Sequence, residues 1–176
     1  MHSRMQIIRG DITEFNVDVI VNAANKTLLG GGGVDGAIHK RAGPKLLEEC
    51  RAHDGCATGD AKITFGYELK ARHVIHAVGP VWCGGNMDEE KNLENCYLRC
   101  LELAVENKAA TIAFPAISTG AYGFPLKLAS KIAISAVCRG LDNEAQLKLV
   151  IFSCFNDLAE EIYLETLKTF QVYKSV

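Results

Sequence analysis

Four consecutive glycines, residues 30–33, are the feature that most constrains how this chain folds. They follow a β-branched segment at residues 17–21 and lead into apolar residues at helical spacing, which predicts a strand, a loop and a helix over residues 33 to about 42. Glycine loses the most backbone freedom on folding, and four glycines give little packing in return. They do allow backbone N–H groups at a helix N-terminus to approach an anion closely. We therefore predict a phosphate-bearing ligand at this loop.

Two common nucleotide-binding motifs do not explain these glycines. The spacing of Gly31, Gly33 and Gly36 formally matches the dinucleotide fingerprint, but about eight residues separate the glycines from the preceding strand. A Walker-type phosphate loop needs Gly-Lys-Ser/Thr after its spacer, and the chain has no such sequence. A flexible loop is the remaining alternative, although flexible linkers rarely lead straight into a helix.

A second loop has similar chemistry. Residues 118–124, Ser-Thr-Gly-Ala-Tyr-Gly-Phe, combine glycines with hydroxyl groups and enter another helix that we expect to begin at Pro125. Two such loops facing each other are suited to hold both sides of a diphosphate. The alternative is a sharp turn that the chain topology requires.

Strand-like and helix-like segments alternate along the chain, which predicts an α/β fold with a largely parallel sheet. In such sheets, ligands bind beyond the carboxyl ends of the strands. The unusual loops all follow strands, so we expect them to form one site. The predicted strands cover residues 5–8, 17–21, 61–65, 73–78, 111–114 and 147–153. The predicted helices cover residues 33–42, 44–50, 93–104, a segment from 125 onward, and a segment capped by Asn156 that runs to about 170.

Several polar and aromatic residues near these strand ends have both a functional and a structural interpretation. Asp35, in the first helical turn, suits either the helix dipole or the orientation or deprotonation of water beside a diphosphate. Asn25 is either a residue that binds a ribose hydroxyl or a turn residue. Asp11 is either an acceptor for the exocyclic amine of a base or a turn residue. Phe155 is either a stacking surface for that base or part of the core. We interpret His39 as a structural histidine with satisfied hydrogen bonds rather than a proton carrier.

Composition excludes several classes of protein. The net charge of −2 argues against a nucleic-acid partner, and no apolar run is long enough to span a membrane. The seven cysteines contain no Cys-x-x-Cys pair, and His73 and His76 should point to opposite faces of their strand, so we expect no metal site and no structural disulfides. Most thiols should be small buried hydrophobic groups in a reducing, cytoplasmic location. We interpret residues 1–4 as an addition ahead of a natural start at Met5, and residues 5–176 as one domain.

The chain resembles the macrodomain family, and within it the MacroD type that includes bacterial stand-alone O-acetyl-ADP-ribose deacetylases. The resemblance is carried by residues 10–12 (Gly-Asp-Ile), 19–25 (Val-Ile-Val-Asn-Ala-Ala-Asn), 29–39 (Leu-Gly-Gly-Gly-Gly-Val-Asp-Gly-Ala-Ile-His), 75–80 and 114–125. It covers the chain from about Met5 to Phe170. It implies a three-layer α/β/α sandwich around a mixed, mostly parallel six-stranded sheet, with a cleft for ADP-ribose.

The resemblance also implies the site residues, position by position. It places Asn25 and Asp35 at the distal ribose as the catalytic pair. It implies the following ligand contacts: Asp11 and the Ile12 amide at the adenine, with Phe155 beside it; Asn22; Gly32, Gly33 and Val34 on one side of the diphosphate; and Ser118, Thr119, Gly120, Ala121 and Tyr122 on the other, with Tyr122 against the distal ribose.

The activity that the resemblance implies is hydrolysis of mono-ADP-ribose from acidic side chains of proteins and deacetylation of O-acetyl-ADP-ribose, without a cofactor or a metal. The expected partners are ADP-ribose, mono-ADP-ribosylated proteins and O-acetyl-ADP-ribose. The alternative is a reader module that binds ADP-ribose without turnover; the presence of both Asn25 and Asp35 favours the enzyme. An RNA-associated regulator is a third alternative, which the lack of surplus positive charge disfavours.

Overall fold

The computed structural model describes residues 4–173, so most of the predicted four-residue addition lies outside the described residues. The strands are β1 (Met5–Arg9), β2 (Val19–Ala23), β3 (Ala61–Phe65), β4 (His73–Ala77), β5 (Thr111–Phe114) and β6 (Leu149–Cys154). The helices are α1 (Gly33–Ala42), α2 (Pro44–Ala52), α3 (Glu89–Glu106), α4 (Leu126–Asn143), α5 (Asp157–Tyr173) and one short 3-10 helix, η2 (Ile12–Glu14).

The six strands form one mixed sheet in the order β1-β6-β5-β2-β4-β3. All neighbouring pairs are parallel except β3 and β4, which run antiparallel and leave β3 at an edge. The predicted α/β class and the mostly parallel six-stranded sheet are therefore confirmed. Because every described strand belongs to this one sheet, the fold supports our proposal that residues 5–176 form a single domain.

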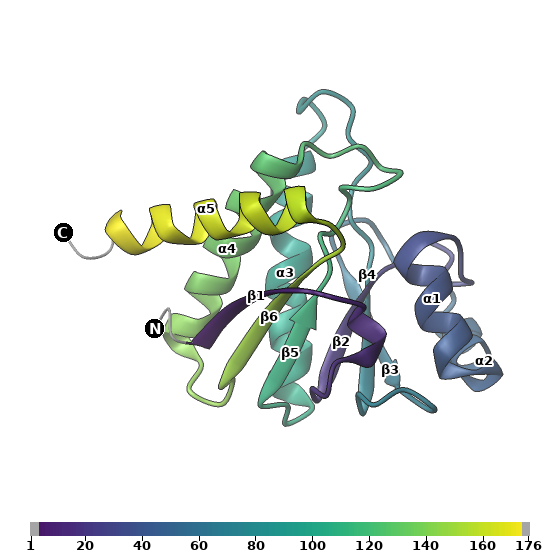
Figure 1. The fold of residues 1–176 in the computed structure, drawn as a ribbon. Helices are drawn as coiled ribbons and strands as arrows, with labels where there is room; N and C mark the ends of the chain where they lie inside the picture. The colour runs from purple at the N-terminus through teal and green to yellow at the C-terminus, as the bar shows by residue number, and fades with distance from the viewer. Residues whose placement is uncertain (1–3, 174–176) are drawn as a thin grey trace.

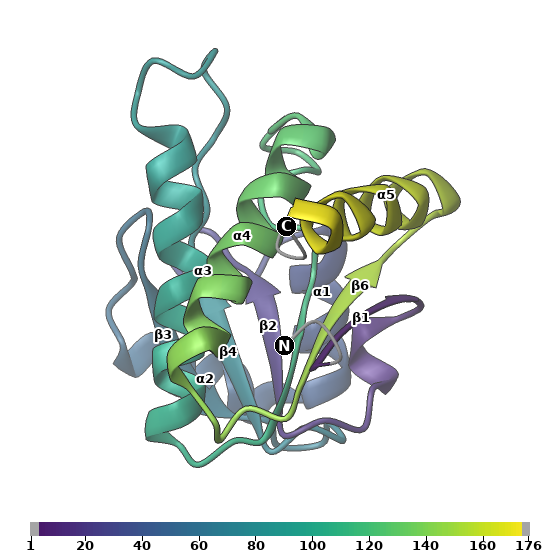
Figure 2. The ribbon, with the colours of Figure 1, turned by 90° about the vertical axis from the view of Figure 1, so that its left-hand side faces the viewer.

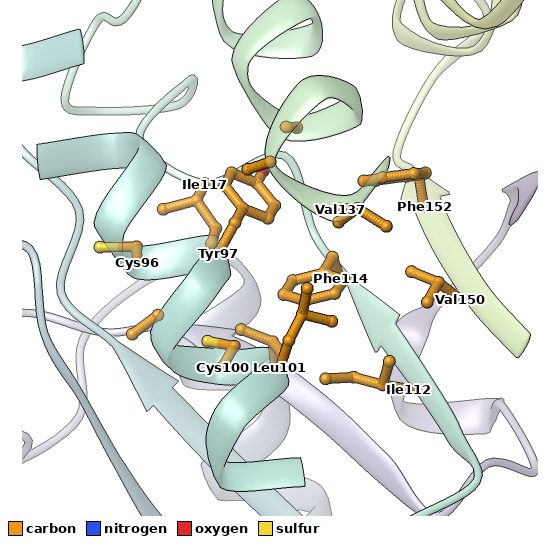
Figure 3. Close-up of a cluster of buried hydrophobic side chains, with 14 of the residues drawn as sticks. Cys96, Tyr97, Cys100, Leu101, Ile112, Phe114, Ile117, Val137, Val150 and Phe152 are labelled. Carbon is orange, nitrogen blue, oxygen red and sulfur yellow. The ribbon is translucent and has the colours of Figure 1, made fainter. Parts of the chain in front are cut away.

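Two helical layers cover the sheet (Figures 1 and 2). Helices α1 and α2 pack on one face, whereas α3, α4 and α5 pack on the other. The larger core lies between the sheet and the three-helix layer, where side chains of α3 meet those of β5 and β6 (Figure 3). The expected three-layer sandwich is therefore also present.

Helix α3 shows how the sequence pattern generates this core. Its apolar residues recur three and four positions apart, so they lie on one face of the helix and pack against the sheet. Those buried residues are Leu93, Cys96, Tyr97, Cys100, Leu101 and Ala104. Five of the seven cysteines are buried, as expected of small hydrophobic groups: Cys50, Cys96, Cys100, Cys138 and Cys154.

The element boundaries differ from the predictions by a few residues at several ends, and helix α3 begins at Glu89, ahead of the predicted residue 93. Strand β2 begins at Val19, two residues later than predicted. The preceding Asp18 lies outside the strand, where its carboxylate accepts hydrogen bonds from the backbone N–H groups of Ala110 (2.8 Å) and Thr111 (3.0 Å). Helix α5 continues to Tyr173. The single turn η2 was not predicted, since three residues are too short for a periodic pattern.

The loops after the parallel strands meet at the carboxyl edge of the sheet, which we call the rim. Along the rim, the loops that follow β1 and β6 come first, then the loop after β5, then the glycine loop after β2, and then the loop after β4. In residues 4–173, none of the helices combines the length and apolar character that a membrane span requires.

Candidate active site

The glycine loop leaves the N-terminus of α1 open. Gly32 caps the helix, and Gly33 begins it with a φ of +57°, a left-handed conformation that favours glycine. A Cβ atom added to Gly32 or Gly33 would meet nothing within 4 Å. The first backbone N–H groups of a helix have no partner within the helix and point outward. The helix start therefore offers exposed donors to an anion, as the glycine run predicts.

Asp35 and Asn25 both lie close to Gly31. A Cβ atom on Gly31 would lie 3.1 Å from Asp35 Oδ2 and 3.5 Å from Asn25 Nδ2. Asn25 Nδ2 donates to the Gly30 carbonyl (3.0 Å), and Asn25 Oδ1 accepts from the Thr27 backbone N–H (3.1 Å) and from its hydroxyl (2.6 Å). The structure thus brings the two predicted catalytic residues together and fixes the amide within the loop.

A buried hydrogen-bond network lies behind Asp35, which is itself only 5% exposed. Asn22 Nδ2 donates to Asp35 Oδ1 (2.7 Å) and lies 3.1 Å from His76 Nδ1. Because the amide nitrogen is a donor, His76 Nδ1 accepts and the ring proton sits on Nε2, which lies 3.0 Å from Thr64 Oγ1. The network holds Asp35 in one orientation. Asn22, expected among the ligand contacts, is fully buried, so its contacts are with Asp35 and His76.

His76 is neutral in this network. Burial, followed by repulsion from His39 and His53, lowers the pKa of His76 to about 3. His39 differs from the prediction of a histidine with satisfied hydrogen bonds. Its Nε2 atom is buried without a hydrogen-bond partner among the described residues, 3.4 Å from Asp35 Oδ1. The satisfied hydrogen bonds that we expected for His39 are therefore missing at this atom, whose recorded ion-pair partner is the Asp35 carboxylate.

His39, Cys50 and His76 form one group that the sequence did not indicate. Their possible metal-ligand atoms all lie within 4.8 Å of one another, the one such group found in residues 4–173. Burial, and then the negative charges of Asp35 and Glu49, raise the pKa of the Cys50 thiol to about 11. The three residues come from α1, α2 and β4, so no sequence spacing connects them.

The far end of the rim, after β1 and β6, is more exposed. Asp11 Oδ1 accepts from the Thr13 backbone N–H (2.9 Å) and from its hydroxyl (2.7 Å), so Asp11 caps η2 while remaining exposed. The next residue, Ile12, has a buried side chain. Phe155 is 95% exposed, which excludes the core alternative for this ring. A hydrogen bond from Gly10 N to the Cys154 carbonyl (3.1 Å) places the two loops side by side.

The loop after β5 contains the second predicted group of ligand contacts. Ser118 has a φ of +65° and a buried hydroxyl that would lie 2.1 Å from a Cβ atom on Gly79, so glycine at position 79 permits the two loops to touch. Thr119 Oγ1 donates to a carbonyl within its own turn. Gly120 and Ala121 are exposed, and no atom lies within 4 Å of a Cβ on Gly120. The exposed tip of the loop therefore consists of small residues.

A hollow of about 470 Å³ lies next to Asn25, on the side of the loop after β4; we call it the β4-side hollow. Tyr122 and Asn25 line it together with residues for which no ligand contact was predicted from the sequence. These are Lys26, Thr27, Thr58, Val78, Gly79, Pro80, Val81, Met87, Glu89 and Asn92.

Taken together, the rim offers helix N–H donors, a buried carboxylate fixed by Asn22, and the amide of Asn25. A fixed carboxylate beside an anion-binding helix start can orient or deprotonate a water molecule. The remaining predicted ligand contact, Val34, lies half-buried in the first turn of α1.

The chain is similar in sequence and in overall structure to known proteins. The model of the Macro domain matches residues 21–133. A macro domain-containing protein of Chlorobaculum tepidum is 57% identical over 160 residues, which is 91% of this chain and 93% of that protein. A protein of Enterobacter sp. named O-acetyl-ADP-ribose deacetylase is 50% identical over 167 residues, 93% of each chain. The structure of an Oceanobacillus iheyensis macrodomain variant with ADPR has a TM-score of 0.89 at 43% identity, covering 93% of this chain and 91% of that one.

Proposed function

The chain belongs to the macro domain family, and from that premise we propose that it binds ADP-ribose and hydrolyses carboxylate esters on the distal ribose. The proposed substrates are mono-ADP-ribose on acidic side chains of proteins and O-acetyl-ADP-ribose. Two comparisons support this proposal: the relative named O-acetyl-ADP-ribose deacetylase, and the similar macrodomain structure with ADPR. A cytoplasmic location stays a prediction from the sequence.

The order of the loops along the rim supports one orientation of the ligand. In this proposal, Phe155 stacks on the adenine, while Asp11 and the Ile12 amide bind its edge. The diphosphate lies between the α1 N-terminus (Gly32, Gly33, Val34) and the small residues of the loop after β5 (residues 118–121). The distal ribose then reaches Tyr122, Asn25 and Asp35. Both ends of the diphosphate meet backbone N–H groups, which suit phosphate oxygens.

The observation that carries the catalytic proposal is the placement of Asp35. Its Oδ1 atom is held by Asn22, whereas Oδ2 faces Gly31 beside the Asn25 amide. One carboxylate oxygen is therefore fixed, and the other is directed toward the proposed ribose. In this proposal Asn25 positions the ribose and Asp35 orients the attacking water; either Asp35 or a substrate phosphate accepts the water proton.

The groups that this site offers are sufficient for a substrate whose leaving group departs readily. In O-acetyl-ADP-ribose, water adds to the acetyl carbonyl, the bond from that carbon to the ribose oxygen breaks, and acetic acid and the ribose hydroxyl are released. In the protein substrate, water adds at the anomeric carbon, the bond from that carbon to the side-chain carboxylate breaks, and the carboxylic acid and a ribose hydroxyl are released. A carboxylate leaves readily, so one carboxylate, one amide and an ordered water suffice. An arginine N-glycosidic bond or a serine ether-type bond has a poorer leaving group, so we expect both to resist cleavage.

The direct experiment is incubation with a glutamate-mono-ADP-ribosylated protein and, separately, with O-acetyl-ADP-ribose, following label release and acetate formation. Turnover of both, with serine-linked and arginine-linked substrates intact, supports the proposal. Efficient cleavage of the serine-linked substrate would refute the leaving-group argument. Binding without turnover would instead identify a reader module.

Calorimetry tests the binding component separately. We expect ADP-ribose to bind with micromolar-scale affinity, about −8 kcal/mol. AMP should bind much more weakly, because it reaches only the end of the rim near Asp11 and Phe155. Equal affinity for the two ligands would contradict the proposed diphosphate site.

A further inference from the structure

The β4-side hollow continues the candidate site beyond the proposed distal ribose. We infer that it receives the polypeptide carrying the ADP-ribosylated side chain and prefers a segment with an acidic residue next to the modified one. This inference rests on the proposed function, because it takes the ester on the distal ribose as the point where the polypeptide is attached.

The strand order sets the direction in which the substrate extends. Strands β1 and β6 come first along the rim, followed by β5 and then β2, and the next neighbour of β2 is β4. A ligand with its adenine at Phe155 and its distal ribose at Asn25 therefore points its ester toward the loop after β4. Asn25 and Tyr122 line the hollow as well, so the hollow begins at the proposed reacting bond.

The size of the hollow fits a peptide better than an acetyl group. Its volume of about 470 Å³ lies within the range of roughly 300–1,000 Å³ that is common for ligand pockets. An acetyl group consists of only a few atoms and would leave most of this volume to water. A few residues of an extended polypeptide would occupy it more fully.

The wall of the hollow is already fixed by hydrogen bonds. The Glu89 carboxylate accepts from the backbone N–H groups of Cys83 (2.9 Å), Gly85 (3.1 Å) and Met87 (2.6 Å), so it holds the loop that precedes α3. Trp82 N donates to the Tyr122 carbonyl (2.8 Å), which joins this loop to the one after β5. A wall built in this way needs little ordering when a polypeptide binds.

The lining combines apolar surface with one cation. Val81 and Met87 are large apolar side chains that are 53% and 69% exposed, respectively, and they suit contacts with a polypeptide. Lys26 is exposed and forms no recorded ion pair in residues 4–173. The Glu89 carboxylate already accepts three backbone hydrogen bonds, so Lys26 is the group that favours an acidic neighbour in the substrate.

The test compares three substrates: a glutamate-mono-ADP-ribosylated peptide with flanking aspartates, the same peptide with flanking serines, and O-acetyl-ADP-ribose. The variants are Met87→Ala and Lys26→Glu. The matched controls are Leu164→Ala, an exposed leucine on α5, and Lys148→Glu, an exposed lysine just before β6, at the opposite edge of the sheet from the rim.

We expect Met87→Ala to lower kcat/KM about fivefold to tenfold for both peptides, the scale of a contact residue at an interface. Lys26→Glu should lower kcat/KM about tenfold for the aspartate peptide and much less for the serine peptide. Both variants should keep kcat/KM for O-acetyl-ADP-ribose within about twofold of the unmodified protein, as should the controls for all three substrates. Equal losses on O-acetyl-ADP-ribose and the peptides, or unchanged peptide turnover, would overturn the inference.

A binding measurement separates this inference from the proposed hydrolysis. If the unmodified protein cleaves none of the three substrates, the proposed function fails, and calorimetry with the aspartate peptide then decides the docking question. Tighter binding of that peptide than of free ADP-ribose, reduced by Lys26→Glu and Met87→Ala, supports docking in the hollow. Equal affinities for the peptide and free ADP-ribose would overturn it.

Discussion

The two ends of the candidate site are built in opposite ways. At the β1–β6 end, Phe155 projects almost fully into solvent and Asp11 is exposed at the start of a short turn. At the β2–α1 end, Asp35, Asn22 and His76 are all buried and linked by hydrogen bonds. Exposed side chains can recognise a ligand without supporting the fold, whereas a buried network contributes to stability and holds a reactive group in place. Substitutions at the two ends should therefore change different measured quantities.

The largest expected effect comes from the proposed catalytic pair. Asp35→Ala and Asn25→Ala should each lower turnover of a glutamate-linked substrate by about 10²-fold or more, the range for a positioned acid–base group. The affinity for ADP-ribose should change far less, since backbone N–H groups and Asp11 make most of the ligand contacts in the proposed binding mode. Turnover assays paired with calorimetry measure both quantities. Full activity in the double variant would remove the assigned mechanism.

The buried end should lose stability when Asn22 is truncated. Asn22→Ala removes the donor that holds Asp35 Oδ1 (2.7 Å) and leaves a buried carboxylate without its partner. We expect the free energy of unfolding to fall by about 2–3 kcal/mol, with a drop in turnover because Asp35 is no longer oriented. Denaturant titration and activity assays measure the two effects. Asn107→Ala, which loses a half-buried side-chain bond remote from the site, is the control for amide removal.

The pH dependence of stability should also come from the buried end. The pKa of His76 lies at about 3 in the fold but near 6.5 in an unfolded chain. The unfolded chain therefore binds a proton that the folded chain excludes, so this contribution is complete above about pH 6.5. It decreases as the pH falls toward 3, by about 1.4 kcal/mol per pH unit.

His76→Gln isolates that contribution from the acid sensitivity of the carboxylates. Glutamine can still accept from Asn22 and donate to Thr64, but it does not titrate. Between pH 6 and 4, the free energy of unfolding of this variant should depend less steeply on pH than that of the unmodified protein. Identical slopes for His76→Gln and the unmodified protein would show that His76 titrates normally.

The exposed end should show the reverse behaviour. Phe155→Ala should weaken binding of both ADP-ribose and AMP by about 1 kcal/mol, the lower end of the range for stacking on a base. The melting temperature should stay nearly unchanged, because the ring is 95% exposed. Calorimetry and thermal unfolding provide the two readings, and Leu158→Ala, an exposed residue nearby on α5, is the control. Unchanged affinities would contradict the stacking role.

The smallest expected effect is that of metal removal. We expect turnover to survive exhaustive chelation, because the proposed chemistry uses a carboxylate and water. The structure sharpens this test, since His39, Cys50 and His76 are close enough together to be considered as ligands. Loss of activity on chelation, recovered with zinc and abolished in Cys50→Ser, would show that this group holds a catalytic metal.

The sequence predicted the parts of this fold that depend on local patterns. The glycine run, the early Asp35 and the helical spacing after it indicated the start of α1, and the apolar repeat from Leu93 to Ala104 indicated α3. In both cases the signal lies within one segment, where periodicity and helix-end chemistry apply. The loops after the strands could also be assigned to one rim, because parallel strands end at the same edge.

The parts that the sequence did not predict depend on contacts between distant segments. His76 meets Asn22, Thr64 and Cys50 from three other elements, and no spacing along the chain encodes that meeting. No sequence pattern indicated the loop held by Glu89 either. The three N–H groups that donate to the Glu89 carboxylate lie in the irregular segment just before Glu89. The burial of Asn22 also depends on distant segments, because its partners Asp35 and His76 lie on other elements.

The strand order has a kinetic consequence. In the proposed binding mode, with β2 between β5 and β4, the nucleotide part of a substrate and the polypeptide attached to it lie on opposite sides of the reacting bond. After cleavage, each product can depart without passing the other. The released polypeptide loses its tether and keeps only its contacts in the β4-side hollow, while ADP-ribose retains both loops around its diphosphate. Free ADP-ribose should therefore compete with substrate as a product inhibitor, whereas the released protein should inhibit weakly, and departure of the nucleotide should limit the steady-state rate.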